Sequence, residues 1–343
     1  MSLKIVQPSE PSLVENIVLT LYSAPGWGKT SLACSADKPL LLDADKGSHR
    51  ATGVKARVII NTWSDVVGLT ADDLTPYNTI IIDTGGTLIT KLMAYLIGQD
   101  PKNAGTYGGM SGKGWGNVNS AIDVLLSKII GAKKDVVIVC HMEEQEKNGN
   151  ITERIDASGK PRNTIYRLSD AMCRILMNPD GSRVLDFDPR EGGYGKNPAQ
   201  LGRIPFLPPD KDPDTLAKVI AQIKATLNCQ TVAQAEAVKR QQEWEQAATK
   251  TTDVAECVAL VKLAHEQKSV VGVDLMTKRL CELCPTLADF NTHVIPLMKD
   301  LNGSIKTLGA SVAKERGWKP DKATGLYVDP SGALTASFAP SVS

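Results

Sequence analysis

The fold of this chain is decided by the stretch Ser23-Ala24-Pro25-Gly26-Trp27-Gly28-Lys29-Thr30-Ser31. The apolar, β-branched run 17–22 precedes it and predicts a strand, and the small-residue run 31–36 follows it and predicts a helix. A strand, a glycine-containing loop and a helix in this order are the context of a phosphate-binding loop. We therefore expect residues 23–31 to bind the phosphates of a nucleotide.

The residue types in this loop suit that interpretation. Gly26 and Gly28 let the backbone approach phosphate oxygens, and the N-terminus of the next helix adds unpaired N–H donors. We expect Lys29 to reach the β- and γ-phosphates, and the Thr30 hydroxyl to ligate Mg²⁺. Ser23 stands where the usual pattern G-x-x-x-x-G-K-[ST] begins with glycine, a replacement that requires a negative φ at that position.

Composition limits the class of protein. The chain has 343 residues, enough for one large domain or a core with an appendage, and its formal net charge is +1. Nucleic-acid binding would therefore depend on local basic loops. The sequence shows neither an apolar run of about eighteen residues nor a signal peptide, so we expect a cytoplasmic protein without a membrane partner. Cys281 and Cys284 form one C-x-x-C with no second pair, which favours core packing over a zinc site.

Continuous apolar runs alternate with helical segments in the first two thirds of the chain. This pattern predicts an α/β fold, with a mostly parallel central sheet buried on both faces by helices. Further strands are expected at 39–45, 57–61, 79–84 and 136–141, a hairpin at 174–187, and helices at 88–97, 117–130 and 214–227.

The composition changes near residue 230, where Gln, Ala, Glu and Lys replace the β-branched runs. Short helices are expected at 253–268, 273–284, 286–300 and 304–316. The predicted organisation is a core at 1–228, a helical C-terminal region at 229–328, and a disordered Ser-, Ala- and Pro-rich tail at 329–343.

Two of the predicted strands end in carboxylates. Asp83 ends the run 79–84, and Asp43 and Asp45 end the run 39–45. Ligands of open α/β sheets bind at the carboxyl ends of the strands, where Asp83 can hold Mg²⁺ through a water. Asp45 is our candidate for orienting or deprotonating an attacking water. The alternative is that these carboxylates only cap the segments that follow them.

The order of these motifs resembles the RecA-like ATPase core. The phosphate-binding loop is followed by Leu-Leu-Leu-Asp-Ala-Asp (40–45), Ile-Ile-Ile-Asp-Thr (80–84) and Val-Ile-Val-Cys-His (137–141). Over residues 15–225 the chain is most similar to AAA-type phage nucleotide-binding ATPases linked to single-strand annealing and recombination. The resemblance implies a RecA-like P-loop core that binds ATP and Mg²⁺.

The resemblance also assigns roles to residues. Asp45 stands where the family has a longer catalytic Glu, and Asp83 matches the Walker B position. His141 falls where the family has a polar sensor of the γ-phosphate, with a purely structural histidine as the alternative. Lys196 and Arg203 would reach the nucleotide of a neighbouring subunit, so a homo-oligomer with active sites between subunits is expected; the alternative is ordinary solvated charge.

Two loops of RecA-like folds bind DNA, and the resemblance places them at 103–116 and 143–163. The candidate contacts with single-stranded DNA are Tyr107, Lys113, Trp115, Lys160, Arg162 and Arg167. Aromatic side chains can stack on bases. The three glutamates Glu143, Glu144 and Glu146 argue against a uniformly basic surface, and ordinary solvated loops are the alternative.

The expected function is therefore ATP-dependent handling of single-stranded DNA in phage recombination or replication, with a single-strand-binding or annealing protein as a possible partner, in the host cytoplasm if the protein is phage-encoded. Three alternatives stay open. They are an ATPase motor or loader that acts on a protein, a P-loop kinase of small molecules, and a module that binds ATP without turnover.

Overall fold

The computed structural model describes residues 5–106, 109–147, 150–157, 160–190, 192–207, 211–301 and 303–329. The chain divides into two compact units, one of them Ser12–Thr231 and the other the described residues of Val232–Ser343 and Met1–Pro11. The tail predicted to be disordered lies outside the described residues, except for Asp329.

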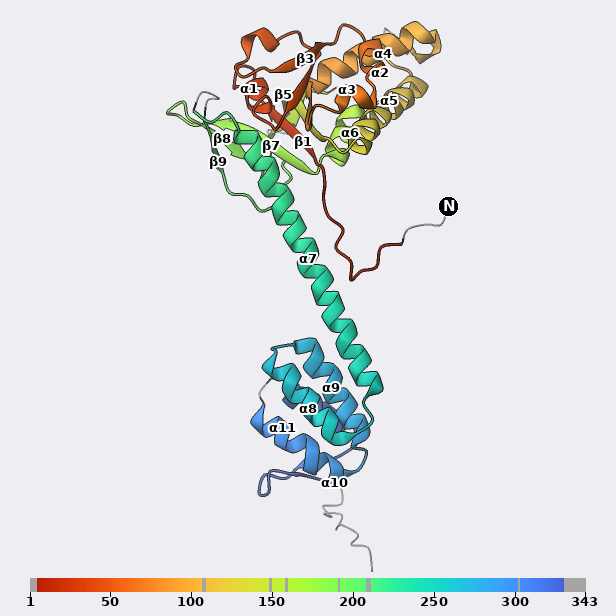
Figure 1. Ribbon diagram of the computed structural model, residues 1–343, viewed down its shortest axis with the longest axis vertical. Helices are drawn as coiled ribbons and strands as arrows, with labels where there is room; N and C mark the ends of the chain where they lie inside the picture. Colours follow the sequence, from red (N-terminus) through yellow and green to blue (C-terminus); the bar gives the residue numbers. More distant parts are fainter. Residues whose placement is uncertain are drawn as a thin grey trace, which may run out of the picture. The chain divides into compact units, whose positions relative to one another are not determined.

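The described part of the first unit is built on one nine-stranded sheet (Figure 1). Its order is β3-β2-β4-β5-β1-β7-β8-β9, and β6 pairs with β5 outside this path. The strands from β3 to β7 in that order are parallel, whereas β8, β9 and β6 pair antiparallel. The strands are β1 (Val18–Ser23), β2 (Pro39–Asp43), β3 (Ala56–Ile59), β4 (Thr79–Asp83), β5 (Asp135–Lys147), β6 (Asn150–Ile155), β7 (Ala171–Met177), β8 (Arg183–Asp186) and β9 (Ile204–Phe206).

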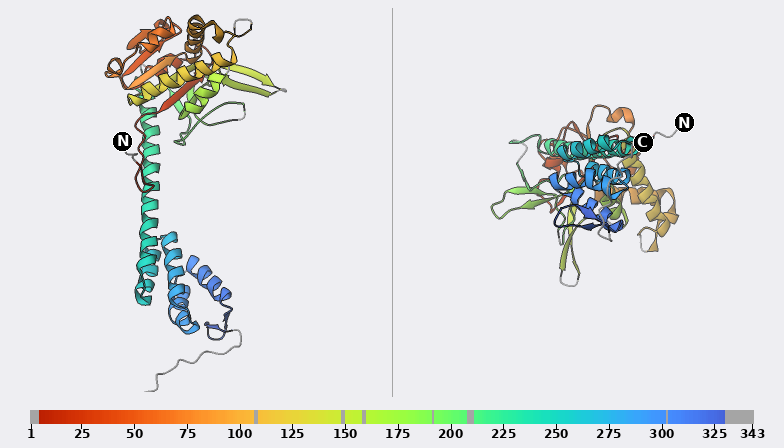
Figure 2. Two further views of the ribbon diagram at one scale, coloured as in Figure 1. Left: turned by 90° about the vertical axis from the view of Figure 1, so that its right-hand side faces the viewer. Right: turned by 90° about the horizontal axis from the view of Figure 1, so that it is seen from below.

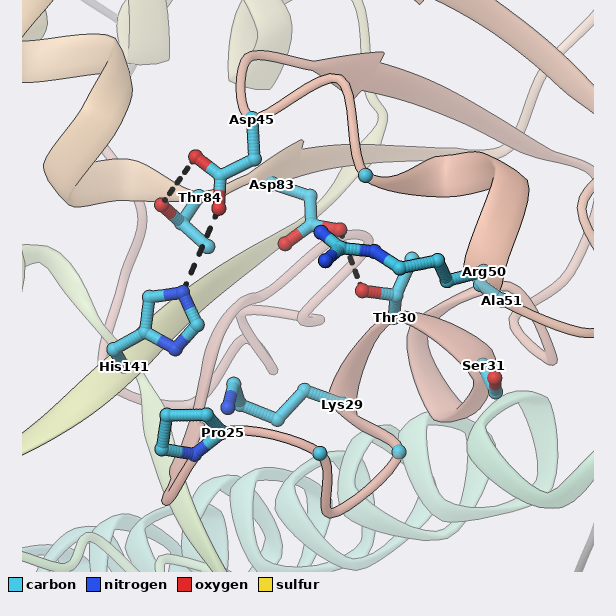
Figure 3. Close-up of a pocket in the computed structure, with 13 residues that line it drawn as sticks. Pro25, Lys29, Thr30, Ser31, Asp45, Arg50, Ala51, Asp83, Thr84 and His141 are labelled. Carbon is cyan, nitrogen blue, oxygen red and sulfur yellow. Dashed lines mark hydrogen bonds and ion pairs between the residues drawn. The ribbon is translucent and has the colours of Figure 1, made fainter.

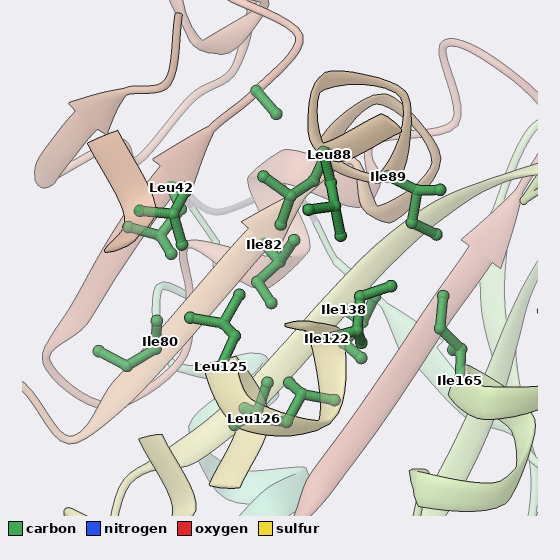
Figure 4. Close-up of a cluster of buried hydrophobic side chains, with 14 of the residues drawn as sticks. Leu42, Ile80, Ile82, Leu88, Ile89, Ile122, Leu125, Leu126, Ile138 and Ile165 are labelled. Carbon is green, nitrogen blue, oxygen red and sulfur yellow. The ribbon is translucent and has the colours of Figure 1, made fainter. Parts of the chain in front are cut away.

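Helices cover both faces of this sheet. On one face lie α2 (Trp63–Val67), α3 (Ala71–Leu74), α4 (Gly85–Gln99), α5 (Gly112–Gly131) and α6 (Lys160–Leu168); on the other lie α1 (Lys29–Ala33) and the first turns of α7 (Thr215–Lys250). Successive strand residues alternate between the faces: Ile80 and Ile82 join the first cluster, shown in Figure 4, and Ile81 joins the second. The sheet is therefore buried on both sides, and the predicted fold class is confirmed.

The second unit is helical. Its elements are the later turns of α7, α8 (Val254–Glu266), α9 (Val270–Leu283), α10 (Leu287–Asp289), the π-helical turn η4 (Phe290–Val294), α11 (Ile295–Asp300), α12 (Ser304–Glu315) and the short pair β10 (Lys319–Pro320) and β11 (Tyr327–Val328). Cys281 and Cys284 are buried in its hydrophobic core with Cys257 and Phe290, as the sequence predicted. Among the described helices, none has the length and apolar character needed to cross a lipid bilayer.

Three segments differ from the sequence-based expectation. The helix predicted at 214–227 continues to Lys250, because residues 215–250 contain neither glycine nor proline. The predicted loop 103–116 begins at the last residue of a short turn, η2 (Pro101–Asn103), and its final residues, from Gly112 on, form the start of α5. The predicted loop 143–163 is instead a hairpin of β5 and β6 followed by α6, and Figure 2 (left) shows this hairpin extending beyond the helices of its unit.

Candidate nucleotide-binding site

A pocket of about 290 Å³ lies at the carboxyl ends of the parallel strands β1, β2, β4 and β5 (Figure 3). The sheet register brings Ser23 beside His141 and Asp43 beside Asp83, so one edge gathers residues from distant parts of the chain. The pocket is lined by Pro25, Gly26, Gly28, Lys29, Thr30, Ser31, Asp45, Gly47, Arg50, Ala51, Asp83, Thr84 and His141. Most of the predicted loop thus borders the pocket, together with the predicted acids and histidine at the strand ends.

The loop has the backbone conformation that its sequence requires. Gly26 and Gly28 have φ values of 80° and 86°, which L side chains rarely adopt, and Ser23 belongs to the extended strand β1. Arg183 supports the loop: its Nη1 atom donates to the Trp27 carbonyl at 3.1 Å. A Cβ on Gly28 would clash with this guanidinium. Nothing in the sequence around Arg183 pointed to this role.

Lys29 is buried at the mouth of the loop. Its ammonium donates to the carbonyls of Ser23 at 3.0 Å and Ala24 at 2.9 Å, and burial lowers its pKa. Because hydrogen bonds between two charged groups are stronger than those to neutral carbonyls, phosphate oxygens are better partners for this ammonium than the loop itself. Lys29 can therefore exchange its hydrogen bonds to the two carbonyls for hydrogen bonds to the phosphates of a nucleotide.

Thr30 and Asp83 meet in the middle of the pocket. The Thr30 hydroxyl donates to Asp83 Oδ2 at 2.6 Å, and the Asp83–Thr84 peptide is cis. Burial raises the pKa of Asp83, an effect that the hydrogen bond from Thr30 opposes. A hydroxyl and a carboxylate are oxygen ligands that Mg²⁺ accepts beside phosphates and water. Among the described residues no cluster of three or more His, Cys, Asp or Glu side chains is arranged to hold a metal without such help.

The two acids after β2 have different surroundings. The Asp43 carboxylate accepts the N–H groups of Gly47 at 3.1 Å and Ser48 at 3.2 Å, so it caps the turn η1 (Ser48–Arg50). Asp45 instead lies in the pocket, where its backbone N–H donates to the Asp83 carbonyl at 3.2 Å. The sequence left capping and pocket lining as alternatives for both acids. In the structure Asp43 caps a turn and Asp45 lines the pocket.

The Asp45 carboxylate is held between His141 and Thr84. Its Oδ1 atom accepts from the Thr84 hydroxyl at 3.1 Å, and its Oδ2 atom lies 3.5 Å from His141 Nε2 (Figure 3). Burial would raise the pKa of this carboxyl, but hydrogen bonds from His141 and neighbouring threonines outweigh burial and lower it to about 2. Asp45 is therefore ionised throughout the neutral range. His141 Nδ1 is buried without a hydrogen-bond partner among the described residues.

Three of the basic residues predicted to bind DNA are paired with acids. Lys113 lies 3.2 Å from Asp100, and Arg167 lies 3.3 Å from Asp123. Arg162 is paired with Glu143 at 2.9 Å. Trp115 is half-buried and packs against the core beside the sheet. Tyr107 and the side chain of Lys160 lie outside the part of the molecule that the structure describes.

The two cations predicted to act on a neighbouring subunit have partners inside their own chain. The Lys196 ammonium donates to the carbonyls of Tyr166 and Ser169, both at 2.6 Å. Arg203 Nε lies 3.6 Å from Asp186 Oδ2. Neither side chain lines the pocket of its own chain, and Lys196 is folded inward where an extended side chain was expected.

Residues 15–199 match the model of a protein family that is described as an AAA domain. No curated protein matches the chain. Among solved structures, a KaiC-like protein from the hyperthermophilic archaeon Pyrococcus horikoshii superimposes with a TM-score of 0.33 and 9% sequence identity. That alignment covers 62% of this chain and 97% of the archaeal one.

Proposed function

The chain belongs to this AAA-domain family, a P-loop family, and on that premise we propose that it binds ATP with Mg²⁺ in the pocket and hydrolyses it. The observation that carries the proposal is the position of Asp45. Its carboxylate shares one pocket with Lys29, Thr30 and Asp83, and His141 and Thr84 fix its orientation. A phosphate-binding loop and a fixed acceptor for water are thus combined at one sheet edge.

The residues of the chain divide the work of phosphoryl transfer. Lys29 and the loop N–H groups bind the phosphates, and Thr30 and Asp83 are the groups that would hold Mg²⁺. When bound, Mg²⁺ neutralises negative charge on the outer phosphates. A carboxyl with a pKa of about 2 is a weak base, so Asp45 acts by accepting a hydrogen bond from the attacking water and orienting it. Positioning and charge stabilisation supply most of the catalysis in such reactions.

Purified protein with Mg²⁺ and ATP provides the test. We expect release of inorganic phosphate that requires Mg²⁺, and binding of a non-hydrolysable ATP analogue in calorimetry. Tight binding without phosphate release would instead support the module without turnover, and transfer of phosphate to a small-molecule acceptor would support the kinase.

Single-stranded DNA is the activating ligand that we propose for this ATPase, in recombination or replication. Strand β5 supports the idea, because it carries His141 in the pocket and continues as the β5–β6 hairpin. The corresponding assembly is a homo-oligomer with ATP sites between subunits. The tests are the ATPase rate with and without single-stranded DNA, and sedimentation with and without ATP.

An acidic hairpin favours a second candidate, an ATPase that acts on a protein partner. Glu144 and Glu146 are exposed on β5, where they would repel a phosphate backbone, while the exposed Glu143 is paired with Arg162. An ATPase rate that is insensitive to DNA would favour this candidate over the first.

A further inference from the structure

Arg50 is a cation of the pocket that the sequence motifs did not identify. It ends the turn η1, its side chain is exposed, and it lines the pocket together with Thr30 and Asp83. Figure 3 shows its side chain running from the η1 backbone toward these two residues. In the described part of the chain its guanidinium has neither a hydrogen bond nor an ion pair. All of its donors are thus available to a ligand.

The turn that carries Arg50 is fixed from three sides. The buried Asp43 carboxylate accepts the N–H groups of Gly47 and Ser48. Arg57 Nη1 donates to Ser48 Oγ at 2.6 Å, and the Thr52 N–H donates to Ser31 Oγ at 3.1 Å. The last bond joins the segment to α1, which begins at Lys29. The base of the Arg50 side chain is therefore anchored to both the sheet edge and the phosphate-binding loop.

Gly47 leaves the space that the guanidinium occupies. A Cβ atom built on Gly47 would lie 2.6 Å from Arg50 Nη2, closer than unbonded atoms approach. The backbone of Gly47 has φ −97°, which any residue adopts, so an alanine here would displace Arg50 without straining the turn. This gives a way to move the guanidinium while keeping its charge.

Arg50 adds a second protein cation to a pocket that is rich in negative charge, beside Lys29 and the expected Mg²⁺. Asp45 and Asp83 place two carboxylates beside the site of a polyanionic ligand, and Lys29 is the cation of the loop. A guanidinium binds phosphate oxygens through two parallel hydrogen bonds, and it stays charged at all relevant pH values. Lys196, which the sequence suggested for such a role across a subunit interface, donates to two carbonyls of its own chain, while Arg203 is half exposed and lies 3.6 Å from Asp186.

We propose that Arg50 binds the phosphate chain of the nucleotide in cis, on the side where Thr30 and Asp83 meet. The proposal deepens the function proposed above and rests on it, since it assigns a further binding residue to the same pocket. Phosphate, and not the base or the sugar, is the group that Arg50 recognises.

The test measures binding rather than turnover. Two affinities are compared for wild type, Arg50→Ala, Arg50→Lys and Gly47→Ala. Calorimetry measures the binding of a non-hydrolysable ATP analogue with Mg²⁺. Competition measures the binding of Mg²⁺-tripolyphosphate, which lacks base and sugar. Lys46→Ala is the matched control, because it removes the same charge from an exposed neighbour that does not line the pocket.

We expect Arg50→Ala to lower the affinity for both ligands by about tenfold or more, because a hydrogen bond between two charged groups is lost. Arg50→Lys should keep part of the affinity that Arg50→Ala loses, and Gly47→Ala should show a smaller loss of affinity. Lys46→Ala should bind both ligands with nearly wild-type affinity. Unchanged affinity of Arg50→Ala, an equal loss in Lys46→Ala, or a loss for the ATP analogue but not for tripolyphosphate would each overturn the proposal. If wild type binds both ligands but releases no phosphate from ATP, hydrolysis is refuted and the role of Arg50 is still decided by these affinities.

Discussion

The nucleotide pocket and the surface predicted to bind DNA use their charged residues in opposite ways. In the pocket, Asp45 is directed inward by uncharged Thr84 and by His141, and Arg50 keeps its donors unoccupied. On the predicted DNA surface, Lys113 and Arg162 are each paired with a carboxylate of the same chain. A cation is available to a ligand in the first region and is largely neutralised in the second.

The difference shows what a sequence motif specifies. The strand order fixes which residues meet at the sheet edge, and a phosphate-binding loop with acids at neighbouring strand ends therefore identifies a pocket. A basic residue in a loop attracts DNA less strongly when an acid of the same chain is paired with it. The acids that pair with Lys113 and Arg162 are 13 and 19 residues away along the chain.

The largest effect should come from the phosphate-binding loop. Lys29→Ala removes the buried ammonium, and with it charged hydrogen bonds to two phosphates, so ATP affinity should fall by about 10³-fold. Calorimetry with Mg²⁺-ATP measures the loss. As a control, Lys113→Ala removes a cation that is already paired, and it should leave ATP affinity unchanged. Wild-type affinity in Lys29→Ala would place the nucleotide elsewhere.

The next effect separates the two acids after β2. Asp45→Asn should bind ATP but release phosphate about 10²-fold more slowly, because the amide is a poorer acceptor for the attacking water. Steady-state kinetics should show the loss in kcat rather than in KM. Asp43→Asn instead weakens the cap of η1 and should reduce thermal stability more than kcat. The reverse pattern would mean that Asp43 is the acid that orients water.

The same carboxyl should give a pH-dependent stability. Its folded pKa of about 2 lies below the unfolded value, so ionised Asp45 stabilises the fold above pH 4, and this contribution is lost as pH falls toward 2. The difference corresponds to about 2 kcal/mol. Urea unfolding of wild type and Asp45→Asn should show a gap between pH 5 and 7 that narrows below pH 4. A gap that keeps the same size from pH 7 to pH 3 would contradict the lowered pKa of Asp45.

The smallest effect concerns the paired surface. Glu143→Gln releases Arg162, whose guanidinium lies 2.9 Å from the Glu143 carboxylate, and it should raise affinity for single-stranded DNA about two- to threefold. Fluorescence anisotropy with an unstructured oligonucleotide measures the change. Glu144→Gln is the control, since it removes the same charge from the next residue. An equal gain in both variants would show a general charge effect and no special role for Arg162.

The sequence predicted the pocket better than its surroundings. The loop at 23–31 and the strand-end residues Asp83 and His141 follow from local patterns, because apolar runs define the strands and the strands define the edge. The β5–β6 hairpin was missed because the outer part of β5, residues 143–147, consists of Glu, Gln and Lys and offers no apolar alternation. The β-branched residues Ile151, Thr152 and Ile155 of β6 are the signal that could have indicated it. Arg50 was missed because its position depends on a turn that Asp43 holds through backbone contacts, which no local pattern announces.

Strand β5 joins the nucleotide pocket to the β5–β6 hairpin, and this connection can couple the binding of a ligand at the hairpin to the binding of a nucleotide. From His141 to Lys147 it is one uninterrupted extended segment, which spans roughly 20 Å at the usual rise per residue. If a ligand binds the hairpin more tightly when His141 contacts a nucleotide, the nucleotide must bind more tightly by the same factor when that ligand is present. The ratio of the affinities of the hairpin for its ligand with and without ATP therefore also gives the factor by which that ligand changes the affinity of the pocket for ATP.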